Sequence, residues 1–298
     1  MKLKFYSWLA AVLLSGSVSS AAAETPPAGG RIAVASFNIR CPVDPPPNDW
    51  ASRLPRIRTL LQKYRWDLLG LQEATVGQLN DLKRISLLDP ESGTGDYDSV
   101  GVGRDDGREA GEFSCILYRR DRFTLLEGGT FWLSETPDEP GTRSWDSACN
   151  RVCSWGKFWD REAGRVFFFF NTHLDHVSAE ARQNGMKLIL ERIRRIAGDL
   201  PVILAGDFNT GPESAPFAAA AAQLNDAARL SRGGHSGPEV TFNEFIFDPA
   251  DRKHNLQIDH VFVSDGVEVL THRTVDDAEG RLFASDHFPV AVDLILPE

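Results

Sequence analysis

Short apolar runs alternate with amphipathic stretches along most of this chain. In the stretches 53–64 and 179–197, apolar residues recur at helical spacing. The longer stretch carries one apolar stripe, made of Met186, Ile189, Leu190, Ile193 and Ile196. Such stripes are typical of helices that bury one face. The pattern therefore predicts helices over 53–64 and 179–197, with another over 76–88.

The apolar runs between these stretches predict strands. Their ranges are 31–39, 67–72, 97–102, 113–118, 123–127, 165–172, 202–205, 258–263 and 289–294. Units of strand and helix at the start are followed by a strand-rich middle. Two sheets, each covered by helices on its outer face, would explain this mixture. We find no internal repeat or coiled coil, and we expect a single domain over 31–298.

The first residues have the order expected of a secretory signal. Lys2 and Lys4 precede an apolar run over 5–14, and Ala21 to Ala23 follow it. This order predicts a signal peptide over 1–23 and a linker over 24–30. The run falls short of the ~20 residues that span a bilayer. We therefore expect a periplasmic or secreted monomer with no integral membrane segment after cleavage.

Charge narrows the possible partners. Removing Lys2 and Lys4 takes the formal net charge from −10 to −12. A strongly acidic protein repels polyanions at long range, so we expect no broad basic surface for nucleic acid. A bound metal ion can reverse the field locally. Nucleic acid thus remains possible as a substrate, but not as a partner held by a basic face.

Four cysteines remain in the mature chain: Cys41, Cys115, Cys149 and Cys153. In an oxidising compartment they permit disulfides, with three possible pairings. A link between Cys149 and Cys153 is one option, while Cys115 lies in an apolar run and can simply be buried. Their spacing is not that of a zinc finger.

Polar residues that can carry chemistry recur at the ends of the apolar strands, and the last group, Ser285 to His287, precedes the final strand. Each has an ordinary structural explanation when taken alone, since Asn38 can cap a turn and Glu73 can begin a helix. Their recurrence at strand ends is less easily explained, because loops at the edge of a rigid sheet commonly form an enzyme's cleft. The blocks are Ser36-Phe37-Asn38-Ile39-Arg40, Leu71-Gln72-Glu73, Asn171-Thr172-His173-Leu174, Gly206-Asp207-Phe208-Asn209, Ile258-Asp259-His260-Val261 and Ser285-Asp286-His287-Phe288-Pro289.

In this order, the blocks resemble the endonuclease/exonuclease/phosphatase superfamily, which has a deoxyribonuclease I-like fold. Its members include deoxyribonucleases, sphingomyelinases and inositol polyphosphate phosphatases. The resemblance runs from about residue 31 to residue 296. The segment 130–137 and the polar run after His173 are similar to an exported bacterial branch. The resemblance implies an α/β fold: a four-layer α/β/β/α sandwich of two packed, mainly antiparallel sheets flanked by helices.

The resemblance also implies a metal edge. Glu73 is the expected main ligand, with Asn38 beside it and Asp286 as a further acidic group. The implied ion is Mg²⁺, with Mn²⁺ or Ca²⁺ as alternatives. Carboxylate and amide oxygens suit such hard cations, and the cation would neutralise an anionic phosphate ester.

Catalytic roles follow from the same resemblance. Asp207 and Asn209 are expected to position the attacking water and a phosphate oxygen. His173 and His287 are expected to flank the phosphate, with Asp259 orienting His287. An Asp–His pair fixes the imidazole tautomer and raises its basicity.

Five further residues belong to the predicted site with weaker support. Glu112 is expected to orient His173, although it can also be a surface charge at a strand edge. Arg108 is a candidate phosphate ligand or a solvated loop residue. Asn171, Asp175 and His176 are candidate substrate contacts, and Asp175 with His176 can instead cap the following helix.

The sequence thus predicts a secreted Mg²⁺-dependent phosphoric ester hydrolase, acting on a phosphodiester by attack of water at phosphorus. A secreted non-specific endonuclease is the alternative within the same chemistry. A binding module that has lost catalysis is the alternative of another class, but it would be expected to lack Glu73, Asp207 or His287. A serine esterase would need a Gly-x-Ser-x-Gly turn, which the chain lacks.

Overall fold

The computed structural model describes residues 30–88 and 97–298. The predicted signal peptide over 1–23, and the predicted linker as far as residue 29, lie outside the described residues. In the part that is described, no helix combines the length and apolar character needed to cross a membrane.

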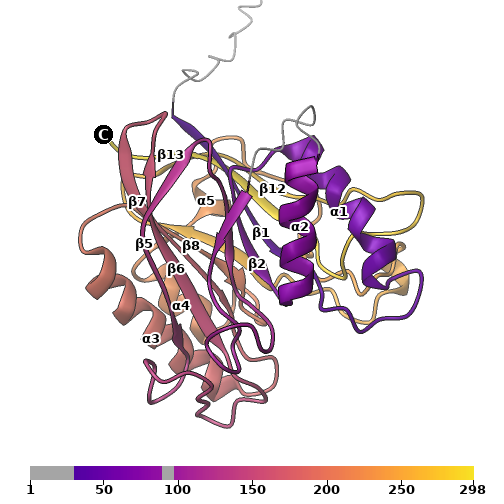
Figure 1. Cartoon of the computed structure of the whole chain (residues 1–298), viewed down its shortest axis with the longest axis horizontal. Helices are drawn as coiled ribbons and strands as arrows, with labels where there is room; N and C mark the ends of the chain where they lie inside the picture. The colour runs from indigo at the N-terminus through magenta and orange to yellow at the C-terminus, as the bar shows by residue number, and fades with distance from the viewer. Residues whose placement is uncertain (1–29, 89–96) are drawn as a thin grey trace, which may run out of the picture.

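Two β-sheets form the centre of the molecule (Figure 1). Over the described ranges, the first sheet has seven strands in the order β10-β12-β13-β1-β2-β4-β3. Their bounds are β1 Arg31–Asn38, β2 Leu68–Gln72, β3 Tyr97–Val100, β4 Ile116–Arg119, β10 His235–Ser236, β12 Glu268–Thr274 and β13 Val290–Ile295. The second sheet, over the same ranges, has six strands in the order β5-β6-β7-β8-β11-β9. Their bounds are β5 Phe123–Trp132, β6 Val152–Asp160, β7 Arg165–His173, β8 Val202–Asp207, β9 Asn225–Asp226 and β11 Asp259–Val263.

The two sheets are mixed, with mainly antiparallel pairing. The parallel pairs are β1 with β2, β7 with β8, and β10 with β12. The first two pairs bear on function, because the carboxyl ends of parallel neighbours emerge at the same edge of a sheet.

Helices cover the outer face of each sheet, which confirms the predicted α/β/β/α layers (Figure 1). Helices α1 (Trp50–Tyr64) and α2 (Val76–Leu88) lie on the first sheet, and α3 (Ala179–Ala197) and α4 (Ala215–Ala221) on the second. The short helical segments α5 (Ala227–Leu230) and η2 (Pro249–Asp251) lie in the connections.

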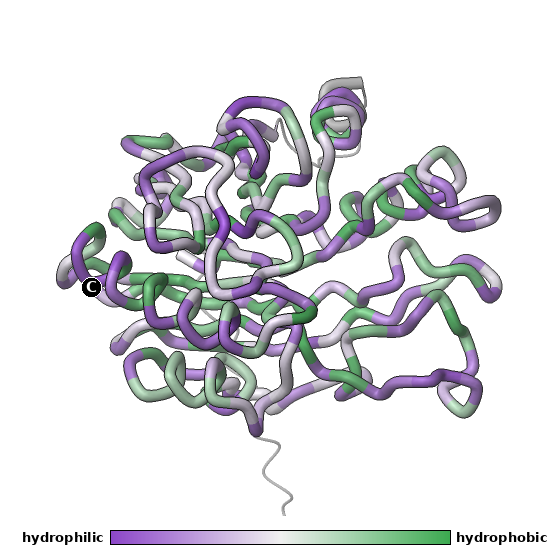
Figure 2. The backbone as a smooth tube through the Cα atoms, turned by 90° about the horizontal axis from the view of Figure 1, so that it is seen from below, coloured by the Kyte–Doolittle hydropathy of each residue, from purple (hydrophilic) through white to green (hydrophobic). Residues whose placement is uncertain are grey.

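Three apolar clusters join these layers. One lies between the sheets and includes Val34 and Phe169. The other two pack α1 and α3 against their sheets, through Ile57 and Ile189 for example. Along the backbone, hydrophobic and hydrophilic positions alternate in both helices and strands (Figure 2), as expected where each element buries one face.

Helix boundaries follow local capping chemistry. Helix α1 begins three residues before the predicted start at Arg53, because Asp49 caps it by accepting a hydrogen bond from the Ser52 amide. Ser178 caps α3 in the same way, through the Ala181 amide. The bounds of α2 and α3 are those predicted from the sequence.

A buried polar bridge joins the sheets near the ends of β2 and β7. The Asn171 side chain donates to the carbonyls of Leu71 and Cys115, each at 2.8 Å, and accepts from Gln72 Nε2 at 2.7 Å. Gly70 makes room for this bridge, since a Cβ there would lie 2.5 Å from Asn171 Oδ1. The bridge fixes β2 against β7.

A buried ion cluster joins the sheets at the opposite ends of these strands. Arg122 donates to Asp160 Oδ1 and Oδ2 at 3.1 and 2.8 Å, and to Asp67 at 2.9 Å. Asp67 also accepts from the Ala33 amide at 2.8 Å. All three charged side chains are buried, so the cluster fixes the edge of the sandwich where β1 and β2 begin.

Candidate active site

The carboxyl ends of β1, β2, β7 and β8 bring the predicted residues to one edge of the sandwich. His173 and Asp207 are partners in the parallel pair β7–β8, and Asp207 and Asp259 are partners in the antiparallel pair β8–β11. Three side chains that can carry chemistry therefore lie abreast on neighbouring strands. Asn38 occupies the corresponding end of β1, with Gln72 as its partner on β2.

A cavity of about 350 Å³ opens at this edge. Its lining includes the predicted residues Glu73, Glu112, His173, His176, Asp207, Asn209, Asp286 and His287. It also includes Arg40, Cys41, Arg104, Cys149, Arg151, Phe242, Leu256 and Ile258.

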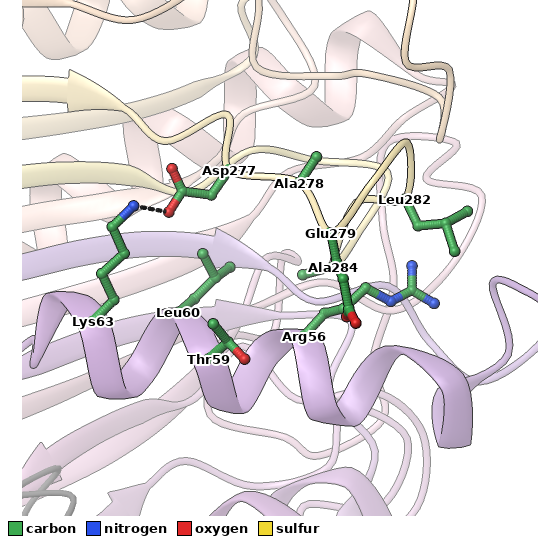
Figure 3. Close-up of a pocket in the computed structure, with 9 residues that line it drawn as sticks. All are labelled: Arg56, Thr59, Leu60, Lys63, Asp277, Ala278, Glu279, Leu282 and Ala284. Atoms are coloured by element: carbon green, nitrogen blue, oxygen red, sulfur yellow. Dashed lines mark hydrogen bonds and ion pairs between the residues drawn. The ribbon is translucent and has the colours of Figure 1, made fainter.

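A larger cavity of about 520 Å³ lies between α1 and the segment 277–284 (Figure 3). Its polar lining includes Arg56, Glu279 and an ion pair between Lys63 and Asp277 at 2.5 Å. Its lining contains no histidine and none of the predicted site residues. Size alone therefore does not identify the reactive cavity of this molecule.

Three residues that line the smaller cavity have an uncommon backbone conformation. Arg40, Glu73 and Asn209 have φ angles of 55°, 59° and 50°. Each lies in a turn just after β1, β2 or β8. The left-handed region is uncommon for residues other than glycine, and such residues cluster at functional sites. These turns aim two side chains from different sheets, Glu73 and Asn209, into one cavity.

Two acidic side chains form one edge of the cavity. Glu73 accepts from Asn38 Nδ2 at 3.0 Å and from the Cys41 amide at 3.1 Å, and these bonds lower the pKa of Glu73 against the opposing effect of burial. Burial raises the pKa of Asp286, and the charge of Glu73 adds to that rise. Arg40 lies 3.7 Å from each carboxylate. A second cation would relieve the remaining repulsion, so this edge fits a hard divalent ion.

Asn38 lies beneath this edge. Its amide oxygen accepts from the Arg40 amide at 3.0 Å, and its Nδ2 donates to Glu73 and Asp207 at 3.0 Å each. The backbone donor and the two carboxylate acceptors together assign the orientation of the amide. Asn38 was predicted as a metal ligand beside Glu73, and in this arrangement it positions the carboxylates of both sheets.

Asp207 lies between the two predicted histidines. The Nε2 atoms of His173 and His287 are 3.4 and 3.7 Å from Asp207 Oδ2. Asp207 Oδ1 accepts from the Asn209 amide at 2.9 Å, which fixes the carboxylate. Burial, reinforced by the charge of Asp259, raises the pKa of Asp207.

The two histidines differ in charge. His287 Nδ1 lies 2.9 Å from Asp259 Oδ2, which is the contact predicted from the sequence. Burial alone would lower the pKa of His287, but the charges of Asp259 and Asp207 outweigh it and raise that pKa. Burial and the charges of Arg151 and Arg104 hold the pKa of His173 well below its usual value. The surrounding charges therefore favour the protonated form of His287 and the neutral form of His173.

Asp207, Asp259 and His287 also form a possible metal-binding group, with ligand atoms within 4.8 Å of one another. His287 Nδ1 is already bonded to Asp259, and the protonated ring supplies the positive charge of this group. Glu73 and Asp286, which line the same cavity, are a second acidic pair that could hold a cation.

Two of the weaker predictions require correction. Glu112 lines the cavity, but its carboxylate accepts from Arg104 Nη1 at 2.6 Å, and within the described chain it makes no hydrogen bond to His173. Arg108 lies outside the cavity on an exposed loop, where its amide donates to Asp106 at 2.8 Å. The guanidinium groups at the site belong instead to Arg40, Arg104 and Arg151.

Asn171 and Asp175 also lie outside the cavity lining. Asn171, predicted as a substrate contact, is fully buried in the bridge between the sheets. Asp175 is buried before α3, and its carboxylate accepts from the Val177 and Ser178 amides at 3.0 and 2.8 Å. Asp175 thus holds the turn that leads into α3, while the N-cap itself is Ser178. His176 does line the cavity.

The cysteines provide no disulfide in this structure. All four are free thiols, with Cys115 and Cys153 buried and Cys41 and Cys149 half-buried.

Comparison with known proteins agrees with the geometry. The model of the endonuclease/exonuclease/phosphatase family matches residues 35–287. An endonuclease/exonuclease/phosphatase from Bacteroides vulgatus is similar at 35% identity and a TM-score of 0.80, covering 89% of this chain and 99% of that one. A mannosyl-6-phosphatase from Bacteroides thetaiotaomicron is similar at 34% identity and a TM-score of 0.78, covering 89% of this chain and 100% of that one.

Two uncharacterised proteins of Acanthamoeba polyphaga mimivirus are 27% and 28% identical over 53% and 54% of this chain. The chain spans 26% and 62% of their respective lengths.

Proposed function

The chain belongs to the endonuclease/exonuclease/phosphatase family, and from that premise we propose that it is a divalent-metal-dependent hydrolase of phosphate esters. The observation that carries the proposal is the placement of His173 and His287 on either side of Asp207, beside the acidic edge of Glu73 and Asp286. One cavity thus combines acid–base groups with a site for a cation.

Glu73 and Asp286 would hold the cation, with Asp207 next to them. We propose Mg²⁺, as the oxygen ligands favour, with Mn²⁺ or Ca²⁺ as alternatives. When bound, the ion would neutralise negative charge on the phosphate.

The remaining chemistry falls to the side chains of this cavity. Asp207 would accept the proton of the attacking water, because its raised pKa makes it a stronger base than an ordinary aspartate. The imidazolium of His287 would donate to a phosphate oxygen, and neutral His173 would orient the phosphate. Water would add to phosphorus as the ester P–O bond breaks, and the leaving alkoxide would take a proton from solvent, to which Asp207 later returns the proton that it accepted.

The site constrains the chemical class of the ester less than it constrains the type of reaction. The sequence favours a phosphodiester. The similar mannosyl-6-phosphatase is named for a phosphomonoester of a sugar, which makes that class of ester a second candidate. Both classes are substrates to be tested. The predicted signal peptide leads us to propose that the enzyme acts after export as a monomer.

Metal dependence provides the first test. Glu73→Gln should lower kcat/KM by about 10²-fold or more, since it removes the charge that holds the cation. Chelation should abolish wild-type turnover of 4-nitrophenyl phosphate and bis(4-nitrophenyl) phosphate, and added Mg²⁺ should restore it.

A thermal shift with Mg²⁺ gives a second readout, because a ligand that binds the folded state raises Tm. The wild type should show this rise and Glu73→Gln should lose it. The matched control is Glu127→Gln, which removes an exposed carboxylate of β5. Full turnover in excess chelator would refute the proposal.

A further inference from the structure

A cationic wall lines the same cavity on the side of His173. It consists of Arg104, Arg151 and His176. The charges of Arg104 and Arg151 act on His173, which places these two guanidinium groups near that ring, and His176 adds a hydrogen-bond donor to them. The acid–base roles proposed above use none of these side chains.

Arg151 is held by a buried carboxylate. The side chains of Arg151 and Asp175 are 5% and 1% exposed, and Arg151 Nε lies 3.5 Å from Asp175 Oδ2. The same oxygen accepts from Ser147 Oγ and the Ala148 amide, each at 3.0 Å. Asp175 therefore positions Arg151 while it also holds the turn before α3. A cation fixed in this way is preorganised for binding.

The contact between Arg151 and His176 fixes a tautomer. Arg151 Nη2 lies 2.9 Å from His176 Nδ1. A guanidinium can only donate hydrogen bonds, so Nδ1 must be the acceptor. In the neutral ring the proton is then on Nε2, and that N–H is a donor available to a ligand in the cavity. His176 thus adds a second donor to the charge of Arg151.

Arg104 completes the wall. Its Nη1 donates to Glu112 at 2.6 Å, while its buried Nε has no hydrogen-bond partner within the described residues. A buried donor without a partner is costly unless a ligand or water satisfies it. Arg104 contributes a further guanidinium group to the same lining, held in place by Glu112.

A metal ion is the competing occupant. Cys149, Asp175 and His176 offer ligand atoms within 4.8 Å of one another. Both oxygens of Asp175 already accept hydrogen bonds from the protein, and His176 Nδ1 accepts from Arg151. A cation there would also face the guanidinium of Arg151. The charges and donors favour an anion.

We propose that Arg151 and His176, with Arg104 beside them, bind the non-bridging oxygens of a terminal phosphate, so that the preferred substrate is a phosphomonoester. This inference rests on the proposed function. Near neutral pH a monoester carries close to two negative charges, because its second pKa is about 6. A diester carries one charge and has a carbon substituent where the monoester has a third free oxygen. The wall matches that additional oxygen and charge.

Substrate preference provides the test. Wild-type kcat/KM should be higher for 4-nitrophenyl phosphate than for bis(4-nitrophenyl) phosphate. Arg151→Met should lower the monoester value by roughly 10- to 100-fold, the range expected when a hydrogen bond to a charged group is lost. The diester value should change by less than about threefold, and Arg151→Lys should recover part of the monoester activity. Arg195→Met, which removes an exposed charge of α3, should leave both values unchanged.

Binding of inorganic phosphate, measured by calorimetry with Mg²⁺ present, gives a readout that does not need turnover. Wild type and Arg195→Met should bind it, and Arg151→Met should bind it at least tenfold more weakly. Equal losses on both esters, or unchanged phosphate affinity in Arg151→Met, would overturn the inference. If the wild type hydrolyses neither ester with any divalent metal, the proposed function fails, and phosphate binding alone then decides the inference.

Discussion

His287 is held between two carboxylates, and its ring nitrogens serve different purposes. Nδ1 is bonded to Asp259 at 2.9 Å, while Nε2 faces Asp207 at 3.7 Å. Asp259 therefore acts through His287 and does not face the substrate itself. Its contribution is to hold the ring in one orientation and to stabilise its charge.

This arrangement predicts a hierarchy of mutational effects. His287→Ala should lower kcat/KM by about 10² to 10⁴, the usual contribution of a well-placed acid or base. Asp259→Asn should cost less, because the ring remains. The double variant should be scarcely worse than His287→Ala alone, since residues that act as a unit are not additive. Losses that multiply fully in kcat/KM would show that the two side chains work independently.

The site residues that the sequence predicts well share one property. Each lies at or near the end of a strand: Glu73 just after β2, Asp207 at the end of β8 and His287 shortly before β13, so strand prediction also places them at an edge. Arg104 and Arg151 are missed because loops bring them to the cavity, and charged residues in loops are ordinary. The one available signal is that Arg151 directly precedes a strand, β6, which is itself missed.

The helices and strands also divide into those that the sequence predicts and those that it misses. Helix α3 is predicted over its full range because it has a long apolar stripe, and β8 is extended by only two residues beyond its prediction. Strand β6, by contrast, contains Gly156 and Lys157 among its aromatic residues, which breaks the apolar run. Two-residue strands such as β9 have too few positions to show any period.

The polar bridge between β2 and β7 gives a prediction about the free energy of unfolding. Gly70→Ala should destabilise the protein by about 2 kcal/mol, since the new Cβ would lie 2.5 Å from Asn171 Oδ1 and would displace a buried hydrogen-bonded group. Urea unfolding measures the change.

Gly77→Ala is the matched control, because it lies in α2 where the nearest atom is 4.0 Å from the new Cβ. Alanine should be neutral or slightly stabilising there. If both variants unfold at the same urea concentration, the bridge contributes nothing to stability.

At the scale of the whole molecule, the cluster of Arg122, Asp67 and Asp160 lies at the edge of the sandwich away from the cavity. Arg122→Met should destabilise the protein by about 3 to 5 kcal/mol, because it leaves two buried carboxylates without their main partner. The activity of the remaining folded protein should be unchanged.

Arg165→Met, an exposed arginine at the start of β7, is the control for this loss of charge. Calorimetric Tm values of the two variants test the prediction. A Tm for Arg122→Met equal to that of Arg165→Met would mean that the cluster is energetically neutral.

The strand order of the first sheet also determines at what stage of folding the cavity can form. Strand β1 lies between β2 and β13. The sheet is therefore continuous only after residues 290–295 have paired with residues 31–38. Asp286 and His287 lie a few residues before β13 and reach the cavity with it. Chains emerge from the ribosome amino-terminus first, so a growing chain has neither a closed sandwich nor a complete cavity. The cavity therefore forms only once the segment that carries Asp286, His287 and β13 has joined the sheet.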